Sequence, residues 1–204
     1  VADQRNYRVL GYRRPFDQDA RADLVVGQES FDAVVKPWTD TSTARRVYGP
    51  SALATDADGN LYIADNPRVL EVDRPFAGDA FPDRVFGQSV LDAFDSYDEV
   101  EATQPHRLPR PWGLGVDGQG RLYVAEAWFD RVLIWSSPLT RQGAADLIVA
   151  QRGSGCAQTY CRLRKSLAVS PAGDLWVTGL GDEAILGYRA PLTANDTPQR
   201  MLAL

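Results

Sequence analysis

Few residues in this chain have the types and spacing that catalysis requires. The sequence contains one histidine, His106, in QPHRLPRP, so it cannot supply the several imidazole ligands of a histidine-rich zinc site. No serine stands in a Gly-x-Ser-x-Gly turn that would support a Ser-His-Asp triad. We therefore predict no catalytic residue, no metal ligand and no cofactor, and we expect His106 to lie in a loop ahead of a strand.

Cys156 and Cys161 offer a second candidate chemistry, the formation of a disulfide. They lie in the glycine-rich segment GSGCAQTYC, and no second cysteine pair is present to complete a zinc knuckle. A disulfide across so short a ring would stabilise the fold by about 2 kcal/mol on the chain-entropy model. It would indicate an oxidising location: secreted, periplasmic or at the cell surface. Two unpaired loop thiols are the alternative.

The bulk composition argues against two classes of partner. The 204 residues carry a formal net charge of −5, whereas a nucleic-acid-binding protein normally presents a basic face. We therefore predict no nucleic-acid partner. No apolar run approaches the ~18 residues that are needed to cross a bilayer, so we also predict no membrane span.

The elements that position all of these residues come from an internal repeat. One segment occurs four times without gaps: RVLGYRRPFDQDARADLVVGQ from Arg8, RVLEVDRPFAGDAFPDRVFGQ from Arg68, RVLIWSSPLTRQGAADLIVAQ from Arg131 and AILGYRAPLTANDTPQRMLAL from Ala184. A segment that recurs along the chain in this way is typical of solenoids, propellers and repeat arrays.

A second module precedes three of the four copies. SALATDADGNLYIAD, WGLGVDGQGRLYVAE and SLAVSPAGDLWVTG each read as an apolar strand, a turn that contains glycine, and a second apolar strand. One complete unit therefore has four short antiparallel strands. A sheet with two apolar faces must be covered on both sides by neighbouring sheets, which is the arrangement of β-propeller blades.

We therefore predict an all-β fold, a segment of a β-propeller that forms a single domain over residues 1–204. A partial first blade is expected at 1–28 and full blades at 49–88, 111–151 and 165–204. A β-sandwich is the alternative, but it would not require the same spacing in every copy. Val1-Ala2-Asp3 aligns with the end of a strand, so we expect an incomplete ring: either a fragment, or a protomer whose ring is completed by a second copy or another chain.

The segment from Pro111 to Val132 resembles the NHL repeat, whose blades read approximately Pro-x-Gly, Asp-x-x-Gly-x-Leu-Tyr-Val-Ala-Asp and then Arg-Val. The matching positions are Pro111, Gly113, Asp117, Gly120, Leu122, Tyr123, Val124, Ala125, Glu126, Arg131 and Val132. The Ala-Asp-Leu-Val-x-Gly-Gln ends of the repeat resemble a bacterial secreted subgroup of NHL proteins that also carries cysteine pairs between blades. The resemblance implies a propeller fold but no particular activity, because propellers host many functions.

An acidic residue and an arginine recur around the same turn in successive copies, as Asp3 and Arg8, Asp65 and Arg68, and Glu126 and Arg131. Such a carboxylate can accept backbone N–H bonds in the turn, and the arginine can pair with it. A catalytic site requires one asymmetric cluster, whereas a pair repeated in successive units indicates architecture. We therefore interpret these pairs as structural.

Binding is the function class that we expect. In a propeller, the links between blades and the turns after the second strand meet at one rim, which would carry the candidate binding residues Arg110, Trp112, Trp128, Phe129 and Asp182. The adjacent aromatics Trp128 and Phe129 could anchor a protein or a small ligand such as a carbohydrate. We predict a non-catalytic scaffold. The alternative is a metal-assisted lyase or a lactonase-like enzyme whose site is completed by residues outside this chain.

Overall fold

The computed structural model describes residues 1–17, 21–36, 46–91, 104–149, 166–178, 184–194 and 196–203. These residues form four antiparallel sheets, and the helix among them is a single 3-10 turn over Gln4–Asn6. None of the described residues form a helix of the length and hydropathy that a bilayer crossing needs. The prediction of an all-β fold is confirmed.

The order of the strands in each sheet is the order in the chain. The first sheet has three strands, β1 (Ala2–Asp3), β2 (Arg8–Gly11) and β3 (Leu24–Val26). The second has β4 (Pro50–Thr55), β5 (Leu61–Asp65), β6 (Arg68–Val72) and β7 (Arg84–Phe86). The third has β8 (Pro111–Val116), β9 (Leu122–Glu126), β10 (Arg131–Trp135) and β11 (Leu147–Val149). The fourth has β12 (Leu167–Val169), β13 (Leu175–Thr178), β14 (Ala184–Tyr188) and β15 (Arg200–Ala203).

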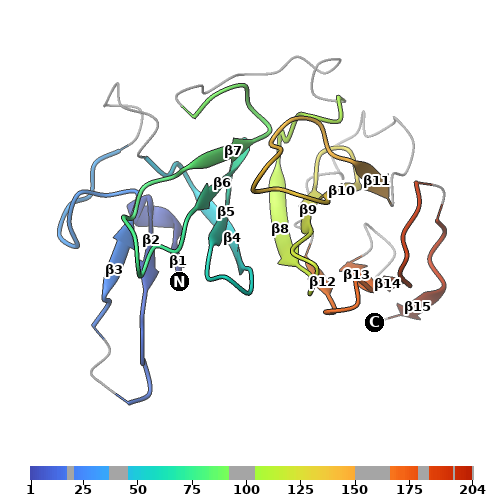
Figure 1. Ribbon diagram of the computed structural model, residues 1–204, viewed down its shortest axis with the longest axis horizontal. Helices are drawn as coiled ribbons and strands as arrows, with labels where there is room; N and C mark the ends of the chain where they lie inside the picture. Colours follow the sequence, from blue (N-terminus) through green and yellow to red (C-terminus); the bar gives the residue numbers. More distant parts are fainter. Residues whose placement is uncertain are drawn as a thin grey trace.

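The sheets succeed one another around an arc, as the blades of a propeller do (Figure 1). Strand β4 contacts β1 on one side and β8 on the other, and β8 in turn contacts β12. The first strands of neighbouring sheets therefore line the inside of the arc. In Figure 1 the two ends of the chain lie on either side of its open part.

The predicted turns between the first two strands of a sheet depend on glycine. Gly59 and Gly120 have φ angles of 88° and 76°, a region in which a Cβ would be strained. The carboxylate of Asp56 closes the first of these turns by accepting bonds from the backbone N–H of Asp58 at 3.0 Å and of Asn60 at 2.9 Å. Asp117 plays the same part before Gly120, where it accepts from the N–H of Gln119 at 2.9 Å.

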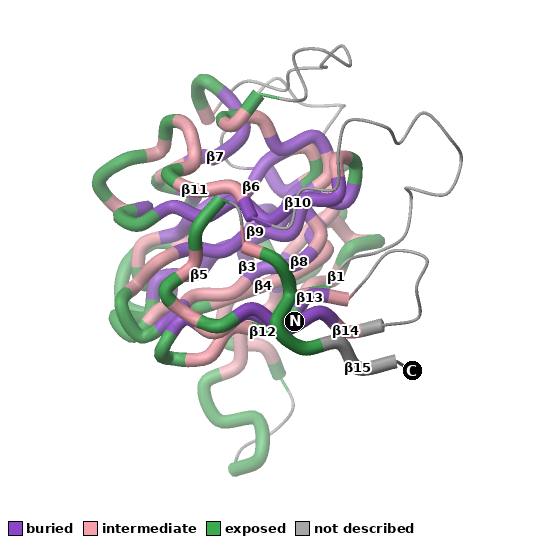
Figure 2. The backbone as a smooth tube through the Cα atoms, turned by 90° about the vertical axis from the view of Figure 1, so that its right-hand side faces the viewer, coloured by how far each residue is buried: buried purple, intermediate pink, exposed green. Residues whose placement is uncertain are grey.

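The core is divided among the joints between successive sheets. Side chains of the first and second sheets form one apolar cluster, those of the second and third another, and those of the third and fourth another. Every residue of β5, β6, β9 and β10 is buried, and Figure 2 shows buried residues concentrated along these middle strands. The nearly continuous hydrophobic sequence of these strands follows from this two-sided burial.

The acid–arginine pair of the second sheet joins a turn to the links on either side of it. Asp65 and Arg68 are fully buried and lie 3.1 Å apart. Asp65 also accepts bonds from the N–H groups of Tyr48 at 2.6 Å and Gly49 at 2.7 Å, while Arg68 donates to the carbonyl of Arg46 at 2.8 Å. Burial raises the pKa of Asp65, and the charge of Arg68 acts in the opposite direction.

The third sheet repeats the device with a glutamate. The Glu126 carboxylate lies 3.5 Å from the Arg131 guanidinium and accepts bonds from the N–H groups of Trp128 at 2.6 Å and Phe129 at 3.0 Å. Arg131 donates to the carbonyl of Arg107 at 3.1 Å, in the link that precedes β8. The contacts agree with the structural role that the sequence predicts for these residues.

Truncation of the buried arginine should destabilise the fold strongly. Arg68→Ala leaves the Asp65 carboxylate buried without its counter-ion, so we expect the free energy of unfolding to fall by about 3–5 kcal/mol. Arg8→Ala is the matched control, because the Asp3–Arg8 pair at 2.8 Å keeps 23% and 15% of its side chains exposed. That loss should be about 1 kcal/mol. Denaturant titration of both variants measures the difference, and equal losses would contradict a special role for the buried pair.

Candidate functional site

The rim around Trp128 presents a pair of stacked aromatic rings. The ring centroids of Trp128 and Phe129 lie 6.4 Å apart with planes at 16°. Phe129 is half-buried beside the Arg131 guanidinium, whose carbon lies 5.3 Å from the ring centroid, whereas Trp128 remains 44% exposed. Trp128 is thus the exposed member of the pair, and Phe129 is partly covered.

Two further predicted residues lie beside this pair. The N–H of Ala127, next to Trp128, donates to the carbonyl of Arg110 at 3.0 Å, which holds the start of β8 against the turn. The guanidinium carbon of Arg110 lies 5.8 Å from the centroid of the Trp112 ring. The structure therefore brings Arg110, Trp112, Trp128 and Phe129 together at one end of the third sheet. Asp182, Cys156 and Cys161 lie outside the described residues.

His106 lies in a loop ahead of β8, where its sequence position places it, and it is exposed. It lines a hollow of about 630 Å³ together with Arg84, Arg107 and Gln88. The Gln88 amide is buried, and neither its oxygen nor its nitrogen has a hydrogen-bond partner among the described residues. The equivalent Gln28 of the first repeat instead binds both backbone groups of Val35. The sequence shows this glutamine in three repeats.

A charged cluster between the second and third sheets was not predicted. The Arg84 guanidinium donates to Glu71 at 2.6 Å and to Asp73 at 2.8 Å, and its Nε donates to the carbonyl of Leu139 in the third sheet at 2.9 Å. The carboxylates of Glu71, Asp73 and Asp83 offer oxygens within 4.8 Å of one another. Arg84 already supplies positive charge among them. The prediction of an enzyme completed by residues outside this chain stays a prediction.

Glu71 is the buried member of this cluster. Within the described part of the chain, one of its carboxylate oxygens has no hydrogen-bond partner. The same is true of the buried hydroxyl of Tyr62, which is opposite Glu71 in the neighbouring strand. Burial raises the pKa of Glu71 to about 7, against the opposing effect of its bond to Arg84. No sequence signal distinguishes this glutamate, because the other repeats have glycine or isoleucine at its position.

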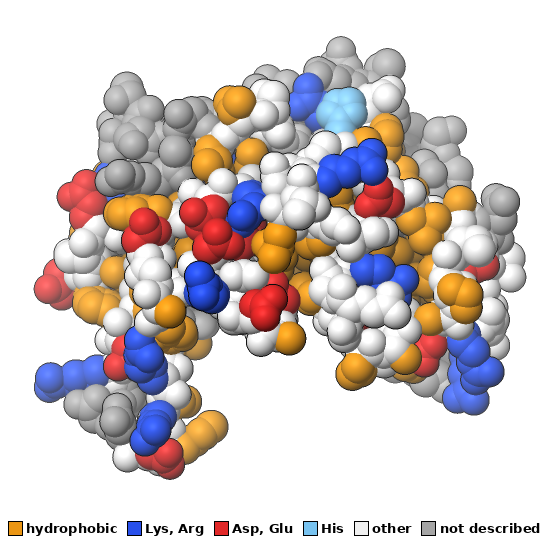
Figure 3. All heavy atoms as spheres, in the orientation of Figure 1, with side chains coloured by type: hydrophobic (Ala, Val, Ile, Leu, Met, Phe, Trp, Pro, Cys, Tyr) orange, Lys and Arg blue, Asp and Glu red, His pale blue; other side chains and the backbone are white. Residues whose placement is uncertain are grey.

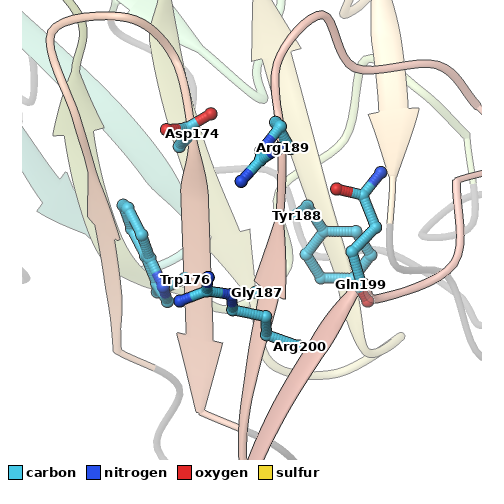
Figure 4. A pocket seen from close by; sticks show the side chains of 7 residues that line it. All are labelled: Asp174, Trp176, Gly187, Tyr188, Arg189, Gln199 and Arg200. Carbon is cyan, nitrogen blue, oxygen red and sulfur yellow. The ribbon is translucent and has the colours of Figure 1, made fainter.

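The outer face of the fourth sheet carries a third feature, a hollow of about 420 Å³ (Figure 4). Its lining includes Trp176 on β13, Gly187 on β14, Arg189 just after β14 and Arg200 on β15. The Trp176 side chain flanks Gly187 in the adjacent strand and is 37% exposed. An aromatic surface and two guanidinium groups thus meet on a sheet face that no described residue covers.

Charges of both signs are spread over the face of the molecule drawn in Figure 3. Acidic and basic side chains alternate over this face, and no continuous basic stripe crosses its described part. A phosphate backbone is normally met by clustered Lys and Arg. The view therefore gives no support for a nucleic-acid interface on this face.

Glu71 should make the stability of the fold depend on pH. Its pKa is about 7 in the folded protein and 4.5 as the ordinary value, so the folded state holds the proton more tightly. The contribution of Glu71 to stability must then fall as pH rises from about 4.5 to about 7 and level off above that. In Glu71→Gln the neutral amide removes this dependence.

The stability advantage of Glu71→Gln over the unmodified protein should therefore grow from pH 5 to pH 7. Denaturant midpoints, measured across this interval for both proteins, give the comparison. Asp58→Asn is a suitable control, because Asp58 is exposed and lies outside this cluster. A constant difference between Glu71→Gln and the unmodified protein would contradict the raised pKa.

Comparison with known proteins gives structural similarity alone. No family model matches the chain, and no curated protein matches it. A streptogramin B lyase structure is similar with a TM-score of 0.45 and 15% identity over 81% of this chain and 42% of that one. A virginiamycin B lyase from Staphylococcus aureus gives 0.43 and 16% over 78% and 45%, and a protein from Lactobacillus plantarum gives 0.44 and 17% over 78% and 43%. The chain spans less than half the length of each of these proteins, and its propeller architecture follows from the order of its own sheets.

Proposed function

We propose that this chain is part of a non-catalytic NHL-type propeller scaffold that binds a small ligand or a protein through the rim around Trp128. The observation that carries the proposal is the exposure of Trp128 on a firmly held turn. Large aromatic side chains at a surface are the commonest anchors of binding sites, because they bury much apolar area at little entropic cost.

The support beneath Trp128 is rigid for a physical reason. Its backbone N–H is bonded to Glu126, and Glu126 is held beside Arg131, with both carboxylate and guanidinium buried. Phe129 fills the space behind the indole with a parallel ring. A ligand that binds this surface does not have to order the turn, which lowers the entropic cost of binding.

The chemistry of the rim favours a flat or ring-shaped ligand that carries negative charge. The exposed face of an indole accepts the apolar face of a ring, and the Arg110 guanidinium beside Trp112 offers charged donors to a carboxylate. A uronic-acid sugar combines both properties. We therefore favour acidic carbohydrates as the ligand class to test.

Binding to an array of neutral and uronate-containing oligosaccharides tests this proposal. We expect binding to acidic members, and Trp128→Ala should weaken it at least tenfold, on the order of the loss for an anchor residue. Phe81→Ala is the control, since Phe81 is 38% exposed but lies between β6 and β7, away from the rim. Equal binding by Trp128→Ala and the unmodified protein, or the absence of any binding to the array, would contradict the proposal.

We also propose that the protein functions outside the cytoplasm, with Cys156 and Cys161 joined as a disulfide. The two cysteines of the sequence support this location, because short-range disulfides persist in oxidising compartments. Alkylation of the denatured protein from its native source should add no mass without reductant and two alkyl groups after reduction. Two alkyl groups added without reductant would contradict the disulfide and remove this support for export.

A further inference from the structure

The hollow on the fourth sheet repeats a site that is occupied elsewhere in the molecule. Leu10-Gly11-Tyr12-Arg13 in the first repeat and Leu186-Gly187-Tyr188-Arg189 in the fourth are identical and occupy the same position in the repeat. In both, the glycine pairs with the first residue of the next strand in the same sheet. The two copies differ in the ring that stands against the glycine: Phe76 of the following sheet at Gly11, and Trp176 of the same sheet at Gly187.

In the first copy, Gly11 makes room for an aromatic ring of the following sheet. A Cβ on Gly11 would lie 2.7 Å from Cζ of Phe76, so only glycine permits this approach. Arg13 then holds the same residue twice: it donates a hydrogen bond to the carbonyl of Phe76, and its guanidinium carbon lies 5.0 Å from the ring centroid. Phe76 directly follows the repeat proline Pro75.

The next joint uses a related contact. Arg84 of the second sheet donates to the carbonyl of Leu139, which follows the repeat proline Pro138 of the third sheet. In two successive joints, an arginine of one sheet thus binds the carbonyl of the residue after the proline in the next sheet. We call the sheet that supplies the residue after the proline the donor side of a joint. The sheet whose arginine binds that residue is the acceptor side.

The fourth sheet carries the acceptor side complete. Gly187 and Arg189 correspond to Gly11 and Arg13, and Arg200 corresponds in the repeat to Arg84. Figure 4 shows Arg200 on β15 and Trp176 on β13 beside Gly187, and Arg189, just after β14, nearer Asp174. The Trp176 indole itself lies against Gly187, because a Cβ there would stand 3.3 Å from its Nε1 and 3.4 Å from its Cδ1. An incoming ring would therefore meet the exposed side of this indole, which is 37% exposed.

The first sheet carries the matching donor side. Pro15 and Phe16 occupy the repeat positions of Pro75 and Phe76. Phe16 is 98% exposed, whereas Phe76 is 39% exposed on its acceptor. An almost fully exposed phenylalanine is unusual for a residue type that is normally buried.

We propose that the Gly187 hollow is the docking site for Phe16 of a second copy of this chain. Phe16 packs there on the exposed side of the Trp176 indole, which covers Gly187, and Arg189 binds the Phe16 carbonyl, as Arg13 binds that of Phe76. The interface is heterologous, because the donor and acceptor are different surfaces of each copy, so copies add head to tail. A closed ring forms if the rotation between copies permits it, and a longer assembly forms otherwise.

A mixing experiment tests this interface with the full chain. By sedimentation velocity, the unmodified protein should assemble beyond its monomer mass of 22.5 kDa as its concentration rises. Phe16→Ala lacks the donor, and Arg189→Ala lacks the acceptor. Each alone should associate at least tenfold more weakly, on the order of the loss for an interface anchor. A mixture of the two retains one intact interface and should form a one-to-one dimer and nothing larger.

Phe31→Ala is the control variant. Phe31 follows β3 of the first sheet and is 45% exposed, but it is not the residue after the repeat proline. It should assemble as the unmodified protein does. Circular dichroism and denaturant midpoints show whether each variant folds, and both test residues are exposed, so folding should persist. A protein that stays monomeric at every concentration, as expected if a further blade of its own polypeptide covers the hollow, would overturn the proposal. The proposal would also be overturned if either variant alone associated as strongly as the unmodified protein does.

Discussion

The second and third sheets of this protein are buried on both faces, and the fold depends on covering both of them. The strands β5 and β9 are buried at every residue, which requires a neighbouring sheet on each side. Burial of apolar area is the main favourable term in folding, but it also removes backbone groups of the links from water. Each joint must therefore combine apolar contact with hydrogen-bond partners for the chain segments that connect the sheets.

The buried acid–arginine pairs meet this second requirement. A buried ion pair gives little net stability by itself, because desolvation cancels much of the attraction. In this fold the charges are used as multiple hydrogen-bond partners: Asp65 binds two backbone N–H groups ahead of β4, and Arg68 binds carbonyls in two different links. The same arrangement around Glu126 fixes the turn that carries Trp128. The rigidity of the rim is thus a consequence of how the links are held.

Features that depend on residues of a single repeat could be predicted from the sequence. Contacts between residues of two different repeats could not. The strand periodicity, the turn glycines and the grouping of Arg110 with Trp128 follow from residues within one unit. The contact of Arg84 with Leu139 and the buried, half-satisfied Glu71 arise where side chains of different sheets meet. A single sequence gives no signal for such contacts, because the repeat alignment places Arg84 and Leu139 at unrelated positions.

The position occupied by Gly11, Glu71, Ile134 and Gly187 shows how each joint is made specific. Gly11 leaves space for Phe76, Glu71 joins a charged cluster with Arg84, and Ile134 packs in the apolar cluster between the third and fourth sheets. The residue at this position therefore varies with the group that packs against it at each joint. Gly187 restores the residue of the first joint, together with its tyrosine and arginine. Because a glycine within a strand weakens the strand unless another group approaches closely, both glycines mark a close aromatic contact: with Phe76 of the next sheet at Gly11, and with Trp176 of the same sheet at Gly187.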